Sequence, residues 1–297
     1  MKKVLKYTEI QTKITSLMTF TLVILLLLYH NIPIKGYETL VFFAGMFIFD
    51  LTTTAINNYI DSKSNDQDFG LSRKTMKLIL FTLLGISILL GLWLVVLTDI
   101  IVLLIGAFCF FVGIVYTFGP IAISRQPYGE IVSGVLYGYF IPFLLFYINL
   151  GEAFVSVSLS TTLSIHLNVE YGLMFLVFGI VPTLLTAAIM LGNNTCDLER
   201  DIKVNRFTLV YYIGQRNAIH LMYALYSLVY VGIILGVILG IYPIYMLGVL
   251  LSAVLALKHV HAFGLLCDKE KSFPYVIKNF IMIMMLMIVV LSVSTLI

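Results

Sequence analysis

Long runs of apolar residues, separated by short polar stretches, repeat along the whole chain. A helix needs about 20 apolar residues to cross the hydrocarbon core of a bilayer. Of the 297 residues, 61% are hydrophobic and only 11% are charged, whereas soluble domains carry about 25% charged residues. The sequence therefore predicts an all-α, polytopic membrane protein with nine transmembrane helices. These spans lie at 14–34, 39–60, 78–98, 100–119, 131–150, 171–192, 217–239, 241–257 and 275–297.

The distribution of basic residues predicts the orientation of these spans. If the N-terminus is cytoplasmic, Lys35 is the single one of the 18 Lys and Arg residues that falls outside. Because cytoplasmic loops are enriched in Lys and Arg, we predict a cytoplasmic N-terminus and an outside C-terminus in the cell membrane. The first span lacks an A-x-A-like cleavage site, so we interpret it as a retained helix.

We expect one integral membrane domain over 1–297, with pseudo-halves of about 1–150 and 151–297. The three Cys are scattered, which predicts neither a disulfide framework nor a zinc site. The loop 149–170 alternates Val, Ser and Leu, so it forms either a short hairpin or an interfacial segment. We expect no nucleic-acid partner.

Two polar stretches end the second and sixth spans. Residues 56–68 read INNYIDSKSNDQD, and residues 193–201 read NNTCDLERD. At 100° per residue, the first stretch places several polar side chains on one helix face, and the second does the same. Because lipid offers these groups no partner, both faces are expected to point into the bundle. The faces comprise Asp50, Thr54, Asn57 and Asp61 in the first helix, and Asn193, Asp197 and Asp201 in the second.

Carboxylates at two helix ends on one membrane side suit the binding of a metal–diphosphate complex. Mg²⁺ prefers oxygen ligands and completes its shell with water and substrate phosphate. Nearby cations could bind the remaining phosphate oxygens. These cations are Lys63, Arg73, Lys74, Arg125, Lys203 and Arg206.

Other interpretations of the acidic stretches remain open at this point. They could be solvated helix ends, or part of a proton-coupled transporter, although transporter sites tend to lie at the membrane midplane. They could also bind cations in a non-catalytic isoprenoid-binding protein. A phosphatidyl-alcohol transferase is disfavoured because the DG..AR..G..D..D pattern of that family is missing.

The first stretch, NNYID at 57–61, resembles the first Asp-rich signature, NDxxDxxxD, of the UbiA superfamily of intramembrane aromatic prenyltransferases. The second, DLERD at 197–201 followed by IKVNRFTL, resembles the DxxxD signature. The resemblance covers essentially the whole chain, including the number of spans and the motifs after spans two and six. NNTCD followed by ERDIK, with YTFGP at 116–120 and Gly129, is most similar to the branch that prenylates 1,4-dihydroxy-2-naphthoate.

The resemblance implies Mg²⁺-dependent transfer of a polyprenyl group from polyprenyl diphosphate to an aromatic acceptor. That acceptor would be 1,4-dihydroxy-2-naphthoate, giving demethylmenaquinone in menaquinone biosynthesis, or alternatively another aromatic or haem acceptor. Metal ligands would be Asp61, Asp66, Asp68, Asp197 and Asp201, and the catalytic group would be Asn57, Asp61, Asp197 and Asp201. Substrate would be bound by Asn58, Asn193, Asn194, Lys63, Arg73, Lys74, Arg125, Lys203 and Tyr116.

The sequence departs from the family pattern at several positions. Asn58 and Asn65 stand where Asp is usual, so Asp66 or Asp68 supplies the later carboxylate. Cys196 replaces a frequent Arg, and Asn205 lies near an expected Gly. Glu130, Asp50 and water are all candidates for the base that removes the acceptor's proton. Tyr59, Tyr116 and Tyr137 are candidates for stabilising an allylic cation.

Overall fold

The computed structural model describes residues 2–64, 69–119, 122–159 and 161–297, apart from the side chains at positions 11, 61, 63, 64 and 159. The described chain is almost entirely helical and contains one small antiparallel hairpin. It divides into two compact units. The first comprises residues 1–17 and 35–124, and the second comprises residues 18–34 and 125–297.

The first unit is built on two long apolar helices that pack against each other. Its elements are α1 (Lys2–Thr8), η1 (Ile10–Lys13), the start of α2 (Ile14–Tyr29), α3 (Gly36–Ser64), α4 (Arg73–Leu97) and α5 (Ile100–Val115). Helix α3 contacts α4, α5, α1 and η1. The hydroxyl of Ser72 caps α4 by accepting from Thr75 N at 3.2 Å, and the carboxylate of Asp99 caps α5 by accepting from Ile101 N at 2.8 Å.

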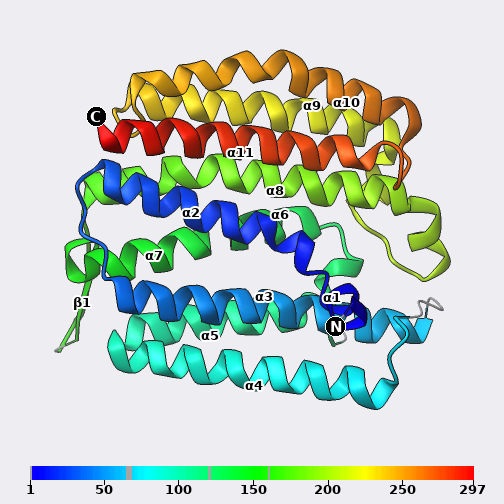
Figure 1. Ribbon diagram of the computed structural model, residues 1–297, viewed down its shortest axis with the longest axis horizontal. Coiled ribbons are helices and arrows are strands. Elements are labelled where there is room, and N and C mark those ends of the chain that lie inside the picture. The colour runs from blue at the N-terminus through cyan, green and yellow to red at the C-terminus, as the bar shows by residue number, and fades with distance from the viewer. Residues whose placement is uncertain (1, 65–68, 120–121, 160) are drawn as a thin grey trace. The chain divides into compact units, whose positions relative to one another are not determined.

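The second unit is arranged around the 35-residue helix α8 (Val169–Lys203). Other elements are η2 (Ile123–Arg125) at its boundary, α6 (Gly129–Val135), the π-helical η3 (Leu136–Phe140), α7 (Ile141–Leu150), η4 (Gly151–Ala153), α9 (Leu209–Ile238), η5 (Ile244–Ser252), α10 (Ala253–Leu266) and α11 (Phe273–Leu296). Helix α8 contacts α6, η3, α7, α9 and α11 (Figure 1). A side chain at Gly138 would overlap the backbone of Thr183, so this glycine allows η3 to approach α8 closely.

The loop at 149–170 forms the hairpin, one of its two expected structures. Strands β1 (Val155–Leu159) and β2 (Leu163–Leu167) pair antiparallel, with Val157 opposite Ile165. The following helix α8 begins at a capped turn, because Asn168 Oδ1 accepts from Glu170 N at 3.0 Å and from Tyr171 N at 3.1 Å.

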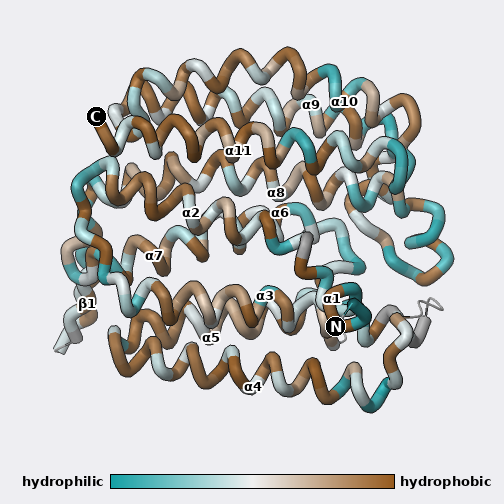
Figure 2. The backbone as a smooth tube through the Cα atoms, viewed as in Figure 1, coloured by the Kyte–Doolittle hydropathy of each residue, from teal (hydrophilic) through white to brown (hydrophobic). Residues whose placement is uncertain are grey.

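Seven helices of the described chain are long and apolar enough to cross a membrane. They correspond to seven of the nine predicted spans, and the protein is a multi-pass membrane protein. The other two predicted spans, 14–34 and 100–119, contain α2 and α5, which are 16 residues each and therefore shorter than a typical span. Figure 2 shows the bodies of the long helices mostly apolar, with polar residues gathered at helix ends and in the loop between α8 and α9.

Candidate active site

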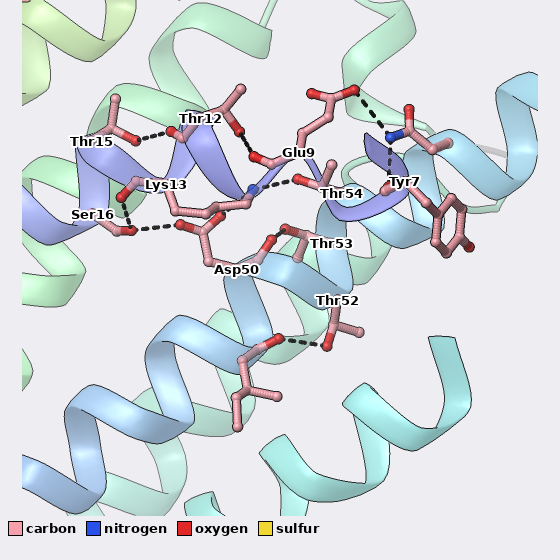
Figure 3. A network of polar contacts seen from close by, with 12 residues as sticks. Tyr7, Glu9, Thr12, Lys13, Thr15, Ser16, Asp50, Thr52, Thr53 and Thr54 are labelled. Carbon is pink, nitrogen blue, oxygen red and sulfur yellow. Dashed lines mark hydrogen bonds and ion pairs between the residues drawn. The ribbon is translucent and has the colours of Figure 1, made fainter. Parts of the chain in front are cut away.

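A buried ion pair joins η1 to the polar face of α3. Lys13 Nζ is 3.0 Å from Asp50 Oδ1, and the two side chains are only 5% and 6% exposed. The same ammonium group donates to the hydroxyl of Thr54, and Ser16 Oγ donates to Asp50 Oδ2 at 2.6 Å (Figure 3). An ionised carboxylate at this depth is costly unless it is paired. Here Lys13 and Ser16 stabilise the charge, so Asp50 is ill placed to act as the base.

The predicted substrate residue Asn58 makes structural contacts in the first unit. It is buried, and its Nδ2 donates to Tyr7 O at 2.9 Å and to Glu9 Oε1 at 3.1 Å. The hydroxyl of Tyr7 donates to Ala55 O at 2.8 Å. Burial raises the pKa of Tyr7, so the phenol stays protonated and keeps this bond. These contacts fix the N-terminal segment on α3 beside the first Asp-rich stretch.

Other predicted site residues of the first unit lie on α3, at the start of α4 and at the end of α5. Thr117 donates its hydroxyl proton to Asn57 Oδ1, which ties this amide to the turn after α5. The guanidinium carbon of Arg73 lies 4.7 Å from the centroid of the Tyr59 ring, a cation–π contact at the start of α4. Tyr116 is half-buried at the end of α5, and Lys74 is exposed.

Four acidic or basic residues of the first stretch cannot be placed as fully. Asp61 and Lys63 belong to the last turns of α3, but their side chains lie outside the described part of the chain. Asp66 and Asp68 lie outside the described residues altogether. Their predicted roles in metal and phosphate binding therefore stay predictions.

The second stretch forms the C-terminal part of α8. Asn193 and Asp197 are one turn apart, and Asn193 Nδ2 lies 3.4 Å from Asp197 Oδ2. Lys269, from the loop between α10 and α11, binds both of them: its Nζ is 2.6 Å from Asp197 Oδ2 and also donates to Asn193 Oδ1. Lys269 was not predicted from the sequence as a site residue.

On a neighbouring face of α8, Asn194 binds Glu130 of α6. Asn194 Nδ2 donates to Glu130 Oε1 at 2.8 Å, and both residues are buried. Within the described part of the chain, Glu130 Oε2, Asn194 Oδ1 and Asp201 Oδ2 are buried without a hydrogen-bond partner. Buried polar atoms are normally satisfied, so each of these oxygens is available to a cation or a hydrogen-bond donor.

The chain turns sharply where α8 ends. Asn205 has a left-handed backbone with φ 54°, and Arg206 N donates to the carbonyl of Asp201 at 2.9 Å. This is the hydrogen bond of a helix-terminating turn at which Gly or Asn is favoured. Asn205 thus meets the conformational need of the Gly expected nearby, and the turn brings Arg206 Nη1 to 3.8 Å from Asp201 Oδ1.

The two remaining predicted cations are exposed in the second unit. Arg125 accepts from Phe207 N at 3.0 Å through its carbonyl oxygen, which joins η2 to the loop after α8. Lys203 is the last residue of α8. The structure therefore places five predicted residues in the C-terminal part of α8: Asn193, Asn194, Asp197, Asp201 and Lys203. Arg125 lies in η2, which is hydrogen-bonded to the loop after α8.

The oxygen-rich chemistry of this region fits the predicted Mg²⁺. Among the described side chains no group of three or more His, Cys, Asp and Glu is gathered as a metal cluster. Mg²⁺ does not require one, because one or two carboxylates with water and substrate phosphate are sufficient. The partnerless buried oxygen of Asp201, one turn from Asp197, is a donor of the preferred kind.

Comparison with known proteins decides the family. A family model described as the UbiA prenyltransferase family matches residues 16–284. The chain belongs to the UbiA family. This confirms the resemblance inferred from the two Asp-rich stretches and places both within the matched region.

Among curated UbiA relatives, the chain is 29% identical over 171 residues to a 1,4-dihydroxy-2-naphthoate octaprenyltransferase of Bacillus subtilis (strain 168). The match covers 58% of this chain and 49% of that protein, so the chain spans about half the length of the relative.

Solved UbiA structures share the fold. A UbiA homologue from Aeropyrum pernix K1 has a TM-score of 0.65 and 15% identity, covering 93% of this chain and 98% of that one. A UbiA homologue from Archaeoglobus fulgidus bound to GPP and Mg²⁺ has a TM-score of 0.56 and 14% identity, covering 99% and 100% of the two chains. These likenesses establish a UbiA-like fold.

The sequence alone does not predict Lys269 as a site residue, and it predicts Glu130 only in part. Lys269 lies in a polar loop, CDKEKS at 267–272, whose charge is visible but whose partner on α8 is 72 residues away. Glu130 emerges from the sequence only as one of three possible bases. The signal for it is an acidic residue next to an apolar run, which does not reveal that Asn194 binds it.

Proposed function

We propose that this protein transfers a polyprenyl group from a polyprenyl diphosphate to an aromatic acceptor with the help of Mg²⁺. The acceptor proposed is 1,4-dihydroxy-2-naphthoate, whose prenylation with loss of diphosphate and CO₂ gives the quinol form of the product. A separate two-electron oxidant then converts this quinol to demethylmenaquinone in menaquinone biosynthesis. Membership of the UbiA prenyltransferase family supports the reaction class, and the naphthoate octaprenyltransferase of Bacillus subtilis supports the acceptor. The A. fulgidus homologue bound to GPP and Mg²⁺ supports the donor and the metal.

The observation that carries the proposal is the C-terminal end of α8. Within one helix, Asn193, Asn194, Asp197 and Asp201 present amide and carboxylate oxygens, and buried Asn194 and Asp201 each keep one oxygen unpartnered in the described chain. Solvated helix ends, the plain alternative, would leave such oxygens to water and would not bury them. A site for a Mg²⁺–diphosphate complex accounts for both burial and charge, because the cation binds the oxygens of the protein and of the diphosphate.

Bound Mg²⁺ would neutralise the charge that develops on the departing diphosphate oxygens. Asp197 and Asp201, with Asp61 and Asp66 or Asp68 of the first stretch, are the proposed residues that hold it. Asn57, Asn193 and Asn194 are proposed to orient the donor, whereas the amide nitrogen of Asn58 is bound by Tyr7 and Glu9. Lys63, Arg73, Lys74, Arg125 and Lys203 are proposed to bind its phosphate oxygens.

Glu130 is our proposed base for the aromatic acceptor. Its Oε1 is held by Asn194 at 2.8 Å, whereas Oε2 is free to accept a hydroxyl or ring proton. Of the two carboxylates considered as base, Asp50 is occupied by Lys13 and Ser16. A base must reach the acceptor's proton within hydrogen-bond distance, and an oriented carboxylate with one open oxygen satisfies that need. Tyr116 is proposed to line the acceptor or cation region.

The proposed topology retains nine spans, with α2 and α5 completing the set. Both are apolar helices of 16 residues. The predicted spans are completed by residues 30–34 after α2 and by residues 116–119 after α5. With the N-terminus in the cytoplasm, the C-terminal end of α8 faces the cytoplasmic side of the cell membrane.

Incubation of purified protein with Mg²⁺, a radiolabelled prenyl diphosphate and a panel of aromatic acids tests the proposal. Lipid-soluble labelled product with 1,4-dihydroxy-2-naphthoate, together with release of inorganic diphosphate, is the expected result. Product with a different acceptor would keep the reaction class and overturn the acceptor. If the protein binds the prenyl diphosphate but releases no inorganic diphosphate with any acceptor, it is a non-catalytic binder. If sealed vesicles show substrate flux but no prenyl transfer, the protein is a transporter.

A further inference from the structure

We propose that Lys269 is a substrate-sensing counter-ion of the metal site. In the substrate-free protein it neutralises Asp197, and on substrate binding it moves to the diphosphate and leaves Asp197 to the metal. The inference rests on the proposed function and adds to it a residue from a third loop, between α10 and α11, and a reason why metal and substrate bind together.

The first evidence is the position of the ammonium group. Lys269 Nζ lies 2.6 Å from Asp197 Oδ2 and also donates to Asn193 Oδ1, so it bridges two of the residues proposed to bind donor and metal. Its positive charge therefore stands at one oxygen of a proposed metal ligand. A cation and Mg²⁺ compete for the negative charge of one carboxylate, because each is repelled by the other.

The second evidence is the construction of the loop that presents Lys269. Asp268 Oδ1 accepts from Glu270 N at 2.9 Å and from Lys271 N at 2.7 Å, which forms a tight turn around Lys269. Ser272 Oγ accepts from Asp268 N at 2.8 Å and donates to Asp268 O at 3.0 Å. The backbone on both sides of Lys269 is thus fixed, and the position of the side chain toward α8 is built into the fold.

The third evidence is that the side chain itself can move. Lys269 is 42% exposed, while the carboxylate it binds is 20% exposed. Besides Asp197 and Asn193, its Nζ lies 5.1 Å from the centroid of the Phe273 ring, a contact that places no directional demand on it. A lysine has a flexible four-carbon stem and a compact charge, so a short swing transfers the charge to a newly bound phosphate.

The consequence is a coupling between metal and diphosphate. Without diphosphate, Lys269 weakens metal binding to Asp197. With diphosphate, Lys269 gains a new anionic partner, Asp197 is released, and the metal binds more tightly. Because such coupling is reciprocal, Lys269 also makes the metal-bound protein bind diphosphate more tightly.

The test compares Lys269→Met with Lys271→Met, which removes an exposed lysine of the same loop while keeping the backbone N–H bonded to Asp268. Mn²⁺ binding to the substrate-free protein is measured by electron paramagnetic resonance, as the loss of the signal of unbound Mn²⁺. Binding of inorganic diphosphate is then measured at saturating Mn²⁺. Lys269→Met should bind Mn²⁺ alone at least about fivefold more tightly and diphosphate at least about fivefold more weakly, the lower end of typical coupling. Lys271→Met should match the unchanged protein in both.

Equal Mn²⁺ affinity of Lys269→Met and the unchanged protein would overturn the counter-ion role, and equal diphosphate affinity would overturn the transfer to phosphate. Lys269→Arg, which keeps the charge, should restore weak Mn²⁺ binding and shows whether the effect of Met is electrostatic. Prenyl transfer by the unchanged protein is measured in parallel. If it is present and Lys269→Met behaves as the unchanged protein, this inference alone fails, whereas absence of transfer counts against the proposed function.

Discussion

Lys13 Nζ lies 3.0 Å from Asp50 Oδ1, and these two buried groups join the N-terminal segment to the middle of α3. The pair explains how a carboxylate is tolerated within an apolar helix of the first unit. It also gives the segment around the start of α2 a structural task, since Tyr7, Lys13 and Ser16 all bind α3.

Asp50→Ala is expected to destabilise the protein strongly. Removing one partner of a buried ion pair leaves the other charge uncompensated, which costs about 3–5 kcal/mol. Thermal unfolding in detergent should show a clearly lower Tm, while Glu152→Gln, at an exposed acid of η4, should leave it unchanged.

The double variant Lys13→Met/Asp50→Leu separates charge from packing. Because both charges are removed together, we expect it to regain most of the Tm lost in Asp50→Ala. A double variant as unstable as the single one would show that shape, and not the unpaired charge, determines the effect.

Glu130→Gln is expected to lower the turnover number by at least about 100-fold, the lower end of what a general base contributes. The amide keeps the size of the side chain and its contact with Asn194, but it cannot take a proton. The KM for prenyl diphosphate should stay nearly constant in a steady-state assay, because Glu130 is proposed to serve the acceptor.

A matched control for this experiment lies on α8. Glu170→Gln changes an exposed acid in the first turn of that helix, and its turnover should equal that of the unchanged protein. If Glu130→Gln turns over as fast as this control, Glu130 is not the base.

Asn205→Val is expected to destabilise the end of α8, whereas Asn205→Gly should be neutral or slightly stabilising. Asn205 has a left-handed backbone, which costs a β-branched residue about 1–2 kcal/mol and costs Gly nothing. Thermal unfolding of the two variants compares them directly. Equal Tm values for Val and Gly would mean that the turn after α8 does not need this conformation.

Much of the fold follows from local pattern, and much of the site does not. Apolar runs of span length mark the seven long helices because a bilayer leaves few alternatives to a helix. The helical spacing of Asn193, Asp197 and Asp201 is by itself sufficient to place them on one side of α8. Helices α2 and α5 end earlier than the predicted spans 14–34 and 100–119, since helix ends depend on turns and contacts as well as on hydropathy.

The partners of charged groups are the part that the sequence does not supply. Lys13 is 37 residues from Asp50, and Lys269 is 72 residues from Asp197. The sequence identifies each lysine only as an inner-side charge, because no local pattern relates it to a distant carboxylate. Glu130 and Asn194 are 64 residues apart, and their hydrogen bond is likewise not predictable from a local pattern. Only the packing of α6 and of the α10–α11 loop against α8 brings the partners within the second unit together.

Removal of divalent cations with a chelator should abolish prenyl transfer, and added Mg²⁺ should restore it. The proposed ligands are oxygen atoms that hold Mg²⁺ together with water and phosphate, so exchange with a chelator is expected to be rapid. Circular dichroism should show unchanged helix content throughout, because the long helices are apolar and form their own backbone hydrogen bonds in the membrane. Transfer that continues in excess chelator would contradict a divalent-cation mechanism.

The proposed role of both Asp-rich stretches in prenyl transfer is tested by single-turnover assays of Asp61→Asn and Asp197→Asn. Each variant is measured separately with Mg²⁺, prenyl diphosphate and 1,4-dihydroxy-2-naphthoate. Each change keeps the side-chain size and removes one negative charge from one of the two Asp-rich stretches. Each variant is expected to retain its helical fold and to lose most of its transfer rate. Near-normal transfer by both variants would contradict the proposed role.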